Sequence, residues 1–125
     1  MNKEKFSLKK RFKSFGYAFN GLRLLISEEH NARIHLIAAI VAVMAGFLLH
    51  ISSLEWVAII LAFGFVISLE IVNTAIENIA DFVSPERHMQ IKKIKDLAAA
   101  GVLIAAITAL IIGLIIFIPK IIILL

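Results

Sequence analysis

The sequence contains no cysteine, only two prolines, and few charged residues, which make up 18% of its 125 positions. Without cysteine the chain has neither disulfide bonds nor thiolate metal sites. The scarcity of proline leaves long stretches uninterrupted, as membrane-spanning helices require. Hydrophobic residues make up 61% of the chain, whereas a soluble domain has about half. The composition therefore predicts an integral membrane protein.

Several enzyme motifs and a cleavable leader are also missing. The chain has no GxxxxGK[ST] phosphate loop, no HxxE metal motif and no Ser-His-Asp set, which excludes the P-loop and protein-kinase architectures. The basic segment at 1–13 does not start a secretory signal, because Tyr17, Asn20 and Arg23 interrupt the apolar positions that follow it.

The basic residues behind the net charge of +4 lie beside apolar runs, which argues against a surface that binds nucleic acid. Eight of the thirteen Lys and Arg residues precede the first apolar run, four lie between 83 and 96, and Lys120 stands near the end. Basic clusters beside spans indicate topology and contact with anionic lipids. The positive-inside rule places the amino terminus and the basic connection in the cytoplasm and the carboxyl terminus outside.

Apolar periodicity predicts an all-α fold in a single domain, 1–125. An amphipathic helix over 5–26 is expected to lie on the membrane surface, with aromatic residues down and cations toward lipid phosphates. Three transmembrane helices are expected over 31–50, 54–83 and 96–118.

Turn residues mark the boundaries of these predicted spans. Ser27 is a candidate N-cap for the first span, followed by glutamates that suit a first helical turn. A polar connection is expected over 86–93, and the third span is expected to end at Pro119. Trp56 is expected to anchor the second span at the interface.

A stripe of polar side chains follows the second span's apolar run, 56–67, which carries no charge. Glu70, Asn73, Glu77 and Asp81 are separated by three or four residues, so they share one helical face. Ionised groups in or near hydrocarbon cost several kcal/mol unless they are paired or ligated. A bound cation is the simplest way to hold these carboxylates.

The depths of these residues suit phosphoryl transfer to a lipid. Glu77 should lie roughly 10 Å closer to the cytosol than Glu70, where Glu29 could meet it, and two carboxylates suit Mg²⁺. The deeper Glu70 has the properties of a general base for a hydroxyl held in the lipid layer. Asn73 can orient a group, and Lys95 can neutralise phosphate charge.

The same residues allow other functions. Aligned carboxylates in a membrane helix also occur in cation or proton pathways, and as hydrogen-bonding groups in an inert oligomer. A small holin-like pore without kinase activity is therefore an alternative, and spacing alone does not decide between these functions.

The run Glu70-x-x-Asn73-Thr74-Ala75-Ile76-Glu77-x-x-x-Asp81, followed by Lys95-Asp96-x-Ala98-Ala99, resembles the signature of the small prokaryotic diacylglycerol kinase family. The resemblance extends to Gly16-Tyr17-x-x-x-Gly21-Leu22-Arg23, to Glu29 and to the three-span layout. It implies a homotrimeric kinase of the bacterial inner membrane that uses MgATP to phosphorylate a lipid alcohol. It also implies a cytoplasmic active site shared between neighbouring subunits.

The resemblance assigns roles position by position. Glu70 matches the family's general base, and Glu29 and Glu77 match its metal ligands, which also lie at the nucleotide. Asn73 and Asp81 match other motif positions without an assigned role. The remaining positions associated with nucleotide are Tyr17, Glu86, His88, Lys95 and Asp96, together with Lys10 or Arg11.

Two departures from the family pattern concern the lipid. Diacylglycerol-specific members tend to have an acidic residue where this chain has His35, and a Gly-Ser pair where it has Ala98-Ala99. The runs around Arg33 and Ala99 look more like the branch that phosphorylates undecaprenol. We therefore place Arg33, His35 and Ala99 with Glu70 at the lipid site, and favour undecaprenol over diacylglycerol.

Overall fold

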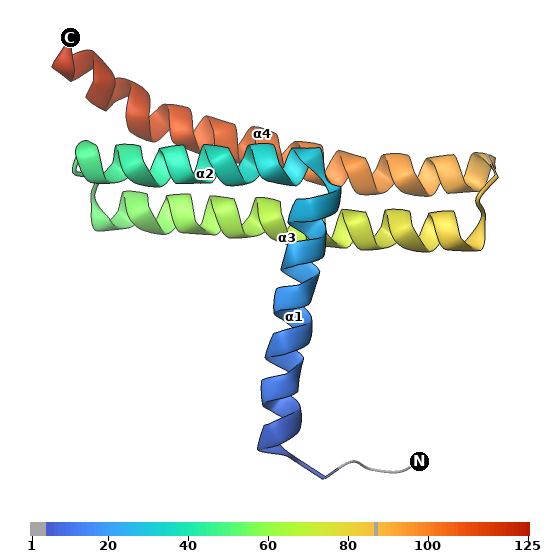
Figure 1. Ribbon diagram of the computed structural model, residues 1–125. Helices are drawn as coiled ribbons and strands as arrows, with labels where there is room; N and C mark the ends of the chain where they lie inside the picture. Colours follow the sequence, from blue (N-terminus) through green and yellow to red (C-terminus); the bar gives the residue numbers. More distant parts are fainter. Residues whose placement is uncertain (1–4, 87) are drawn as a thin grey trace.

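The computed structural model describes residues 5–86 and 88–125, and these residues form four α-helices joined by short links (Figure 1). The helices are α1 (Leu8–Glu28), α2 (His30–Leu48), α3 (Ser53–Val83) and α4 (Met89–Leu124). Among the described residues, α2, α3 and α4 are long and apolar enough to cross a membrane. The predicted all-helical fold with three apolar spans is confirmed. Arg87, in the predicted connection, lies outside the described residues.

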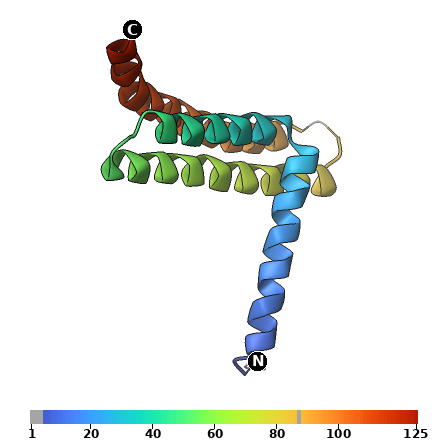
Figure 2. The same ribbon diagram turned by 60° about the vertical axis from the view of Figure 1, so that its left-hand side comes forward.

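The three apolar helices α2, α3 and α4 form an antiparallel bundle, and α1 runs crosswise to it (Figures 1 and 2). The most extensive packing is between α3 and α4, and α2 packs on α3. At the end of the bundle where α3 turns into α4, both helices extend well past the start of α2 (Figure 1). We call this extension of α3 and α4 the overhang.

The helix α1 is mostly exposed in the single chain. It begins at Leu8 rather than 5 because the Ser7 side chain caps it, accepting a hydrogen bond from the Lys10 backbone N–H at 3.4 Å. Only Leu25, near its carboxyl end, is buried. Its exposed aromatic residues are Phe12, Phe15, Tyr17 and Phe19. This exposure suits contact with lipid, although a surface location stays a prediction.

The link between α1 and α2 is shorter than predicted. Ser27 is not an N-cap but lies in the last turn of α1, where its hydroxyl donates to the Leu24 carbonyl at 3.0 Å. The helix continues through Glu28, and Glu29 takes the N-cap position of α2 without a capping side-chain bond. The predicted cap was wrong because the helix has no break before Glu29.

The last helix is longer at both ends than the predicted span over 96–118. It begins at Met89 because His88 caps it, with Nδ1 accepting from the Gln90 N–H at 3.1 Å, so most of the predicted polar connection is helical. Pro119 lies inside α4 instead of ending it. Proline removes one backbone donor and kinks a helix, and the end of α4 turns away from the bundle (Figures 1 and 2).

The opposite end of the bundle, away from the overhang, is held by packing and by one ion pair. Lys120 of α4 lies 2.9 Å from the Glu55 carboxylate on α3. Glu55 also forms a capping box with Ser52, accepting from the Ser52 N–H at 2.9 Å. A small hydrophobic core lies nearby, formed by Ile51, Ile59 and Ile116 with Trp56, Ala58, Ile112 and Phe117 packed against it.

Trp56 packs against the end of α2 in this core. Its ring lies 4.8 Å from the Phe47 ring, measured between centroids. A Cβ atom added to Gly46 would lie 2.7 Å from the Trp56 ring and 3.0 Å from Ile51. Gly46 is therefore required for the close approach of α2 to the start of α3.

We expect Gly46→Ala to be less stable than its matched control Gly101→Ala by about 1–3 kcal/mol, because the tryptophan ring must shift to admit the methyl group. The control adds the same methyl group where no atom lies within 4 Å. Unfolding in detergent micelles, followed through the fluorescence of the chain's single tryptophan, measures the difference. Equal stabilities of the two variants would contradict this packing.

Candidate functional site

The deepest part of the candidate site is the Glu70 carboxylate on α3. Glu70 is only 1% exposed, and its side chain is the largest fully buried one in the described part of the protein. His35 on α2 faces it, with 3.3 Å between Nε2 and the Glu70 Oε1 atom. This is an ion-pair distance when the imidazole is protonated, but Oε1 has no hydrogen-bond partner among the described residues. The packing of α2 on α3 thus brings two predicted site residues together.

The next turn of α3 adds two buried polar residues, Asn73 and Thr74. The Asn73 amide donates to the Glu77 carboxylate at 3.4 Å, so the predicted stripe forms along one face. Within the described residues, Asn73 Oδ1 and Thr74 Oγ1 have no hydrogen-bond partner. A buried polar group without a partner costs about 1–3 kcal/mol. Such oxygens beside Glu70 are typical of a surface that binds a donor group or a cation.

Two further carboxylates belong to Glu77, two turns beyond Glu70 on α3, and to Glu29, at the corner between α1 and α2. Both residues are partly buried. The described residues contain no group of three or more His, Cys, Asp or Glu side chains placed to hold a metal. A closed zinc site of three or four protein ligands therefore does not fit this part of the chain. Mg²⁺ fits, because it takes one or two carboxylates and completes its shell with water and phosphate oxygens.

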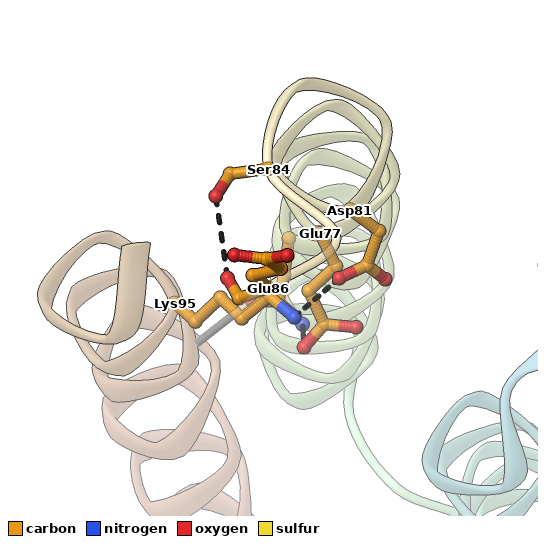
Figure 3. A network of polar contacts seen from close by, with 6 residues as sticks. Glu77, Asp81, Ser84, Glu86 and Lys95 are labelled. Atoms are coloured by element: carbon orange, nitrogen blue, oxygen red, sulfur yellow. Dashed lines mark hydrogen bonds and ion pairs between the residues drawn. The ribbon is translucent and has the colours of Figure 1, made fainter. Parts of the chain in front are cut away.

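A second polar cluster lies at the end of the overhang, where α3 turns into α4. Figure 3 shows Lys95 reaching from α4 toward Glu77 and Asp81 on α3, and its Nζ atom lies 2.5 Å from Asp81 Oδ1. The Ser84 hydroxyl donates to the Glu86 carbonyl at 3.2 Å and shapes the turn.

This cluster borders a cavity of about 510 Å³. Its lining residues are Asp81, Ser84, Pro85, Glu86, His88, Met89, Ile91, Lys92, Lys95 and Asp96. Four of the predicted nucleotide residues are among them, although they are spread over eleven positions of the sequence. Cationic, carboxylate and apolar side chains around one opening suit a nucleotide, whose phosphates need cations and whose base needs apolar contact.

The structure does not bring the α1 residues to this cavity. Lys10, Arg11 and Tyr17 lie on the amino-terminal half of α1, which projects away from the bundle (Figures 1 and 2). All three are exposed. Ala99, one turn beyond Lys95 on α4, is also exposed. A single copy of the chain therefore assembles only part of the predicted set.

Arg33 has a role that the sequence reasoning missed. Its guanidinium donates from Nε to the Ile26 carbonyl at 2.6 Å and from Nη2 to the Ser27 carbonyl at 2.7 Å. The last turn of α1 has no basic residue of its own, and the carboxyl end of a helix favours a nearby cation. The lack of a basic residue in this last turn is the feature of the sequence that could have indicated a cation supplied from elsewhere. The predicted contact of Arg33 with lipid stays a prediction.

Lys92 was also missed. It lines the cavity and lies 2.6 Å from Asp96, its partner one helical turn away. Spacing of four residues between opposite charges predicts such a pair on a helix. The sequence predicts a polar connection over 86–93, outside any helix. The helical spacing of Lys92 and Asp96 was therefore not used to predict a pair.

Most of the chain is similar in sequence to known proteins. Residues 16–117 match the family described as prokaryotic diacylglycerol kinase. Undecaprenol kinase from Bacillus subtilis is 41% identical over 113 residues, which cover 90% of this chain and 92% of that protein. Diacylglycerol kinase from Escherichia coli is 34% identical over 99 residues, covering 79% of this chain and 81% of that protein. Diacylglycerol kinase from Synechocystis sp. is 36% identical over 101 residues, or 80% and 58% of the two chains.

We expect the ion pair between Lys95 and Asp81 to contribute little to the stability of the fold and to act instead in ligand binding at the cavity. The Asp81 side chain is 64% exposed, and exposed pairs contribute about 0–1 kcal/mol. We expect Asp81→Asn to change the free energy of unfolding by less than about 1 kcal/mol, measured by denaturation in micelles. A larger loss of stability would mean that the pair holds α3 and α4 together.

Proposed function

The chain belongs to the prokaryotic diacylglycerol kinase family and is a lipid kinase, and from this premise we propose that it transfers the γ-phosphate of ATP to the hydroxyl group of undecaprenol. The observation that carries the proposal is the Glu70 carboxylate, buried on a membrane-spanning helix and followed outward by Glu77 and the polar cavity. The relative with 41% identity is named undecaprenol kinase, which favours this acceptor over diacylglycerol.

Glu70 is proposed as the general base. A lipid hydroxyl lies below the headgroups, at the depth of a carboxylate buried in a spanning helix, and it needs a proton acceptor as it attacks phosphorus. The hydroxyl oxygen forms the new bond to the γ-phosphorus, the bond to the bridging oxygen breaks to release ADP, and Glu70 takes the proton. His35 and Ala99 are proposed to contact the lipid, His35 through its position beside Glu70.

Glu29 and Glu77 are proposed to hold Mg²⁺. The ion would supply positive charge that neutralises the phosphates during transfer. The partly buried carboxylates suit this role, and the Asn73 amide fixes one Glu77 oxygen. The buried Asn73 Oδ1 atom, which has no partner among the described residues, is a further acceptor for a donor group.

The cavity of the overhang is proposed to bind ATP. Its predicted contacts are Glu86, His88, Lys95 and Asp96, which line it, and Lys92 adds a cation. Lys95 would exchange the exposed Asp81 carboxylate for phosphate oxygens, since both are anionic acceptors of its ammonium group. Asp81 would then hold Lys95 in place between turnovers.

A homotrimer with shared active sites is proposed as the working form. The predicted nucleotide residues Lys10, Arg11 and Tyr17 project away from their own chain's cavity (Figure 1), so a neighbouring subunit is what can bring them to one. The number three comes from the family resemblance.

The crosswise position of α1 supports a proposed placement in the membrane. If α2, α3 and α4 span the bilayer, α1 lies along its surface with its exposed aromatic residues at the interface. The overhang then projects into the cytoplasm with the cavity. We propose the bacterial inner membrane, with the amino terminus and the active site on the cytoplasmic side.

The proposal is tested by phosphate transfer from labelled ATP to undecaprenol and to diacylglycerol, offered in parallel to the purified protein. We expect undecaprenyl phosphate as the dominant product. Glu70→Gln should lower turnover by about 10²–10⁴-fold, because the amide cannot accept the proton. Glu55→Gln, which changes a carboxylate at the other end of the same helix, is the matched control and should keep near-parental turnover.

Dominant phosphorylation of diacylglycerol would keep the reaction and overturn the acceptor. Transfer to neither lipid by folded protein in the presence of Mg²⁺ would overturn the proposed reaction. Leakage of dye from vesicles, measured alongside, would then favour the pore alternative.

The metal assignment predicts a shifted Mg²⁺ requirement. Glu77→Gln should raise the Mg²⁺ concentration for half-maximal turnover by about tenfold or more, because one ligand charge is lost. Titration of turnover with MgCl₂ at fixed ATP measures this, with Glu55→Gln again as control. An unchanged Mg²⁺ requirement would remove Glu77 from the ligand set.

A further inference from the structure

The corner between α1 and α2 consists of a single residue. The helix α1 ends at Glu28 and α2 begins at His30, and Glu29 between them is extended, with φ −112° and ψ 115°. A link of one residue joins two helices that lie crosswise (Figures 1 and 2). Rotation about the two dihedral angles of such a residue would swing α1 through a wide arc. Something other than the link must fix the direction of α1.

The end of α1 packs on α2 and α3, and the guanidinium of Arg33 spans the corner between the helices. It reaches back across the corner from the first turn of α2 and donates to two successive carbonyls of α1, Ile26 at 2.6 Å and Ser27 at 2.7 Å. The Glu29 N–H donates to the Leu25 carbonyl at 2.9 Å. The bond to Leu25 is the last backbone bond of the helix, and the two bonds from Arg33 satisfy two of the carbonyls that a helix leaves open at its end. Both depend on one planar side chain.

We call the two bonds from Arg33 to the Ile26 and Ser27 carbonyls the clamp. The charges and the position of the corner favour it. The last turn of α1 has no basic residue, so no cation of its own offsets the partial negative charge at the helix end. The corner also lies where an apolar span begins, and the open carbonyls at the end of α1 need hydrogen-bond partners there. A guanidinium suits the position, because its fixed fork can bond two acceptors at once.

The clamp also encloses Glu29. The Arg33 backbone N–H donates to the Glu29 carbonyl at 3.4 Å, while its side chain bonds the two carbonyls before Glu28. Glu29 is therefore held on both sides by the same residue. The Glu29 residue is partly buried at this corner.

We infer that Arg33 is a positioning residue that sets the direction of α1 and thereby places the Glu29 carboxylate at the metal site. The second half of this inference depends on the proposed function, which makes Glu29 a metal ligand. The first half depends only on the geometry of the corner. Arg33 acts through Glu29 and α1 and does not itself touch the reacting groups.

The direction of α1 can be measured directly because the chain has no cysteine of its own. Spin labels at Lys13→Cys on α1 and Phe82→Cys on the overhang report the distance between the two, with labelled protein diluted in unlabelled protein. Arg33→Gln is the test variant, and Arg33→Lys is the conservative variant that can bond one carbonyl. Lys9→Gln removes a cation of α1 far from the corner and is the matched control.

We expect a narrow distance distribution in the parent and in Lys9→Gln, and a broad one in Arg33→Gln. The Mg²⁺ concentration for half-maximal turnover should rise by about tenfold in Arg33→Gln, as for other residues that position metal ligands. Added Mg²⁺ should restore the turnover of Arg33→Gln toward the plateau of that variant, because a higher metal concentration offsets the displaced ligand by mass action. Arg33→Lys should be intermediate in both measurements.

An unchanged distance distribution in Arg33→Gln would overturn the inference, whatever happens to activity. Lower turnover at every Mg²⁺ concentration with an unchanged distance would instead support the predicted contact of Arg33 with lipid. If the parent transfers no phosphate, the proposed function fails, and the distance measurement still decides the role of Arg33 at the corner. Circular dichroism of each variant confirms that it is folded.

Discussion

The rest of the structure depends on keeping one carboxylate, Glu70, inside a bundle of membrane-spanning helices. An ionised group at that depth is costly unless other groups hold it. The chain places His35 of α2 against it, and follows it outward with the polar residues Asn73, Thr74 and Glu77. These polar residues are tolerated because they lie on one face of α3 that leads to the charged residues of the overhang.

The different lengths of the helices give the site two depths. The helix α3 has 31 residues and α2 has 19, so α3 is longer by roughly 18 Å at a rise of 1.5 Å per residue. The excess lies almost wholly at the overhang (Figure 1). A carboxylate at hydrocarbon depth and a charged cavity beyond the start of α2 can therefore belong to one continuous helix face. A kinase that transfers phosphate from a water-soluble nucleotide to a lipid hydroxyl needs this arrangement.

The corner at Glu29 joins the crosswise helix α1 to the bundle. The helix α1 turns away from the bundle at the level where the overhang begins, and Arg33 bonds its last carbonyls. The residues that α1 carries toward its amino terminus then lie outside the reach of their own cavity. In the proposed homotrimer, a neighbouring subunit would complete the site.

The sequence by itself determined the membrane class, the three apolar spans and the spacing of Glu70, Asn73, Glu77 and Asp81 on one face, because these follow from composition and helical periodicity. The family motif added roles for these residues and for Lys95. Only the tertiary structure decided which residues meet across helices: His35 with Glu70, Lys95 with Asp81, and Lys120 with Glu55. It also decided that α4 begins at Met89 and continues through Pro119, and that Arg33 closes the corner. Contacts between helices depend on how the helices pack and where caps start and stop them, and local periodicity carries no information about either.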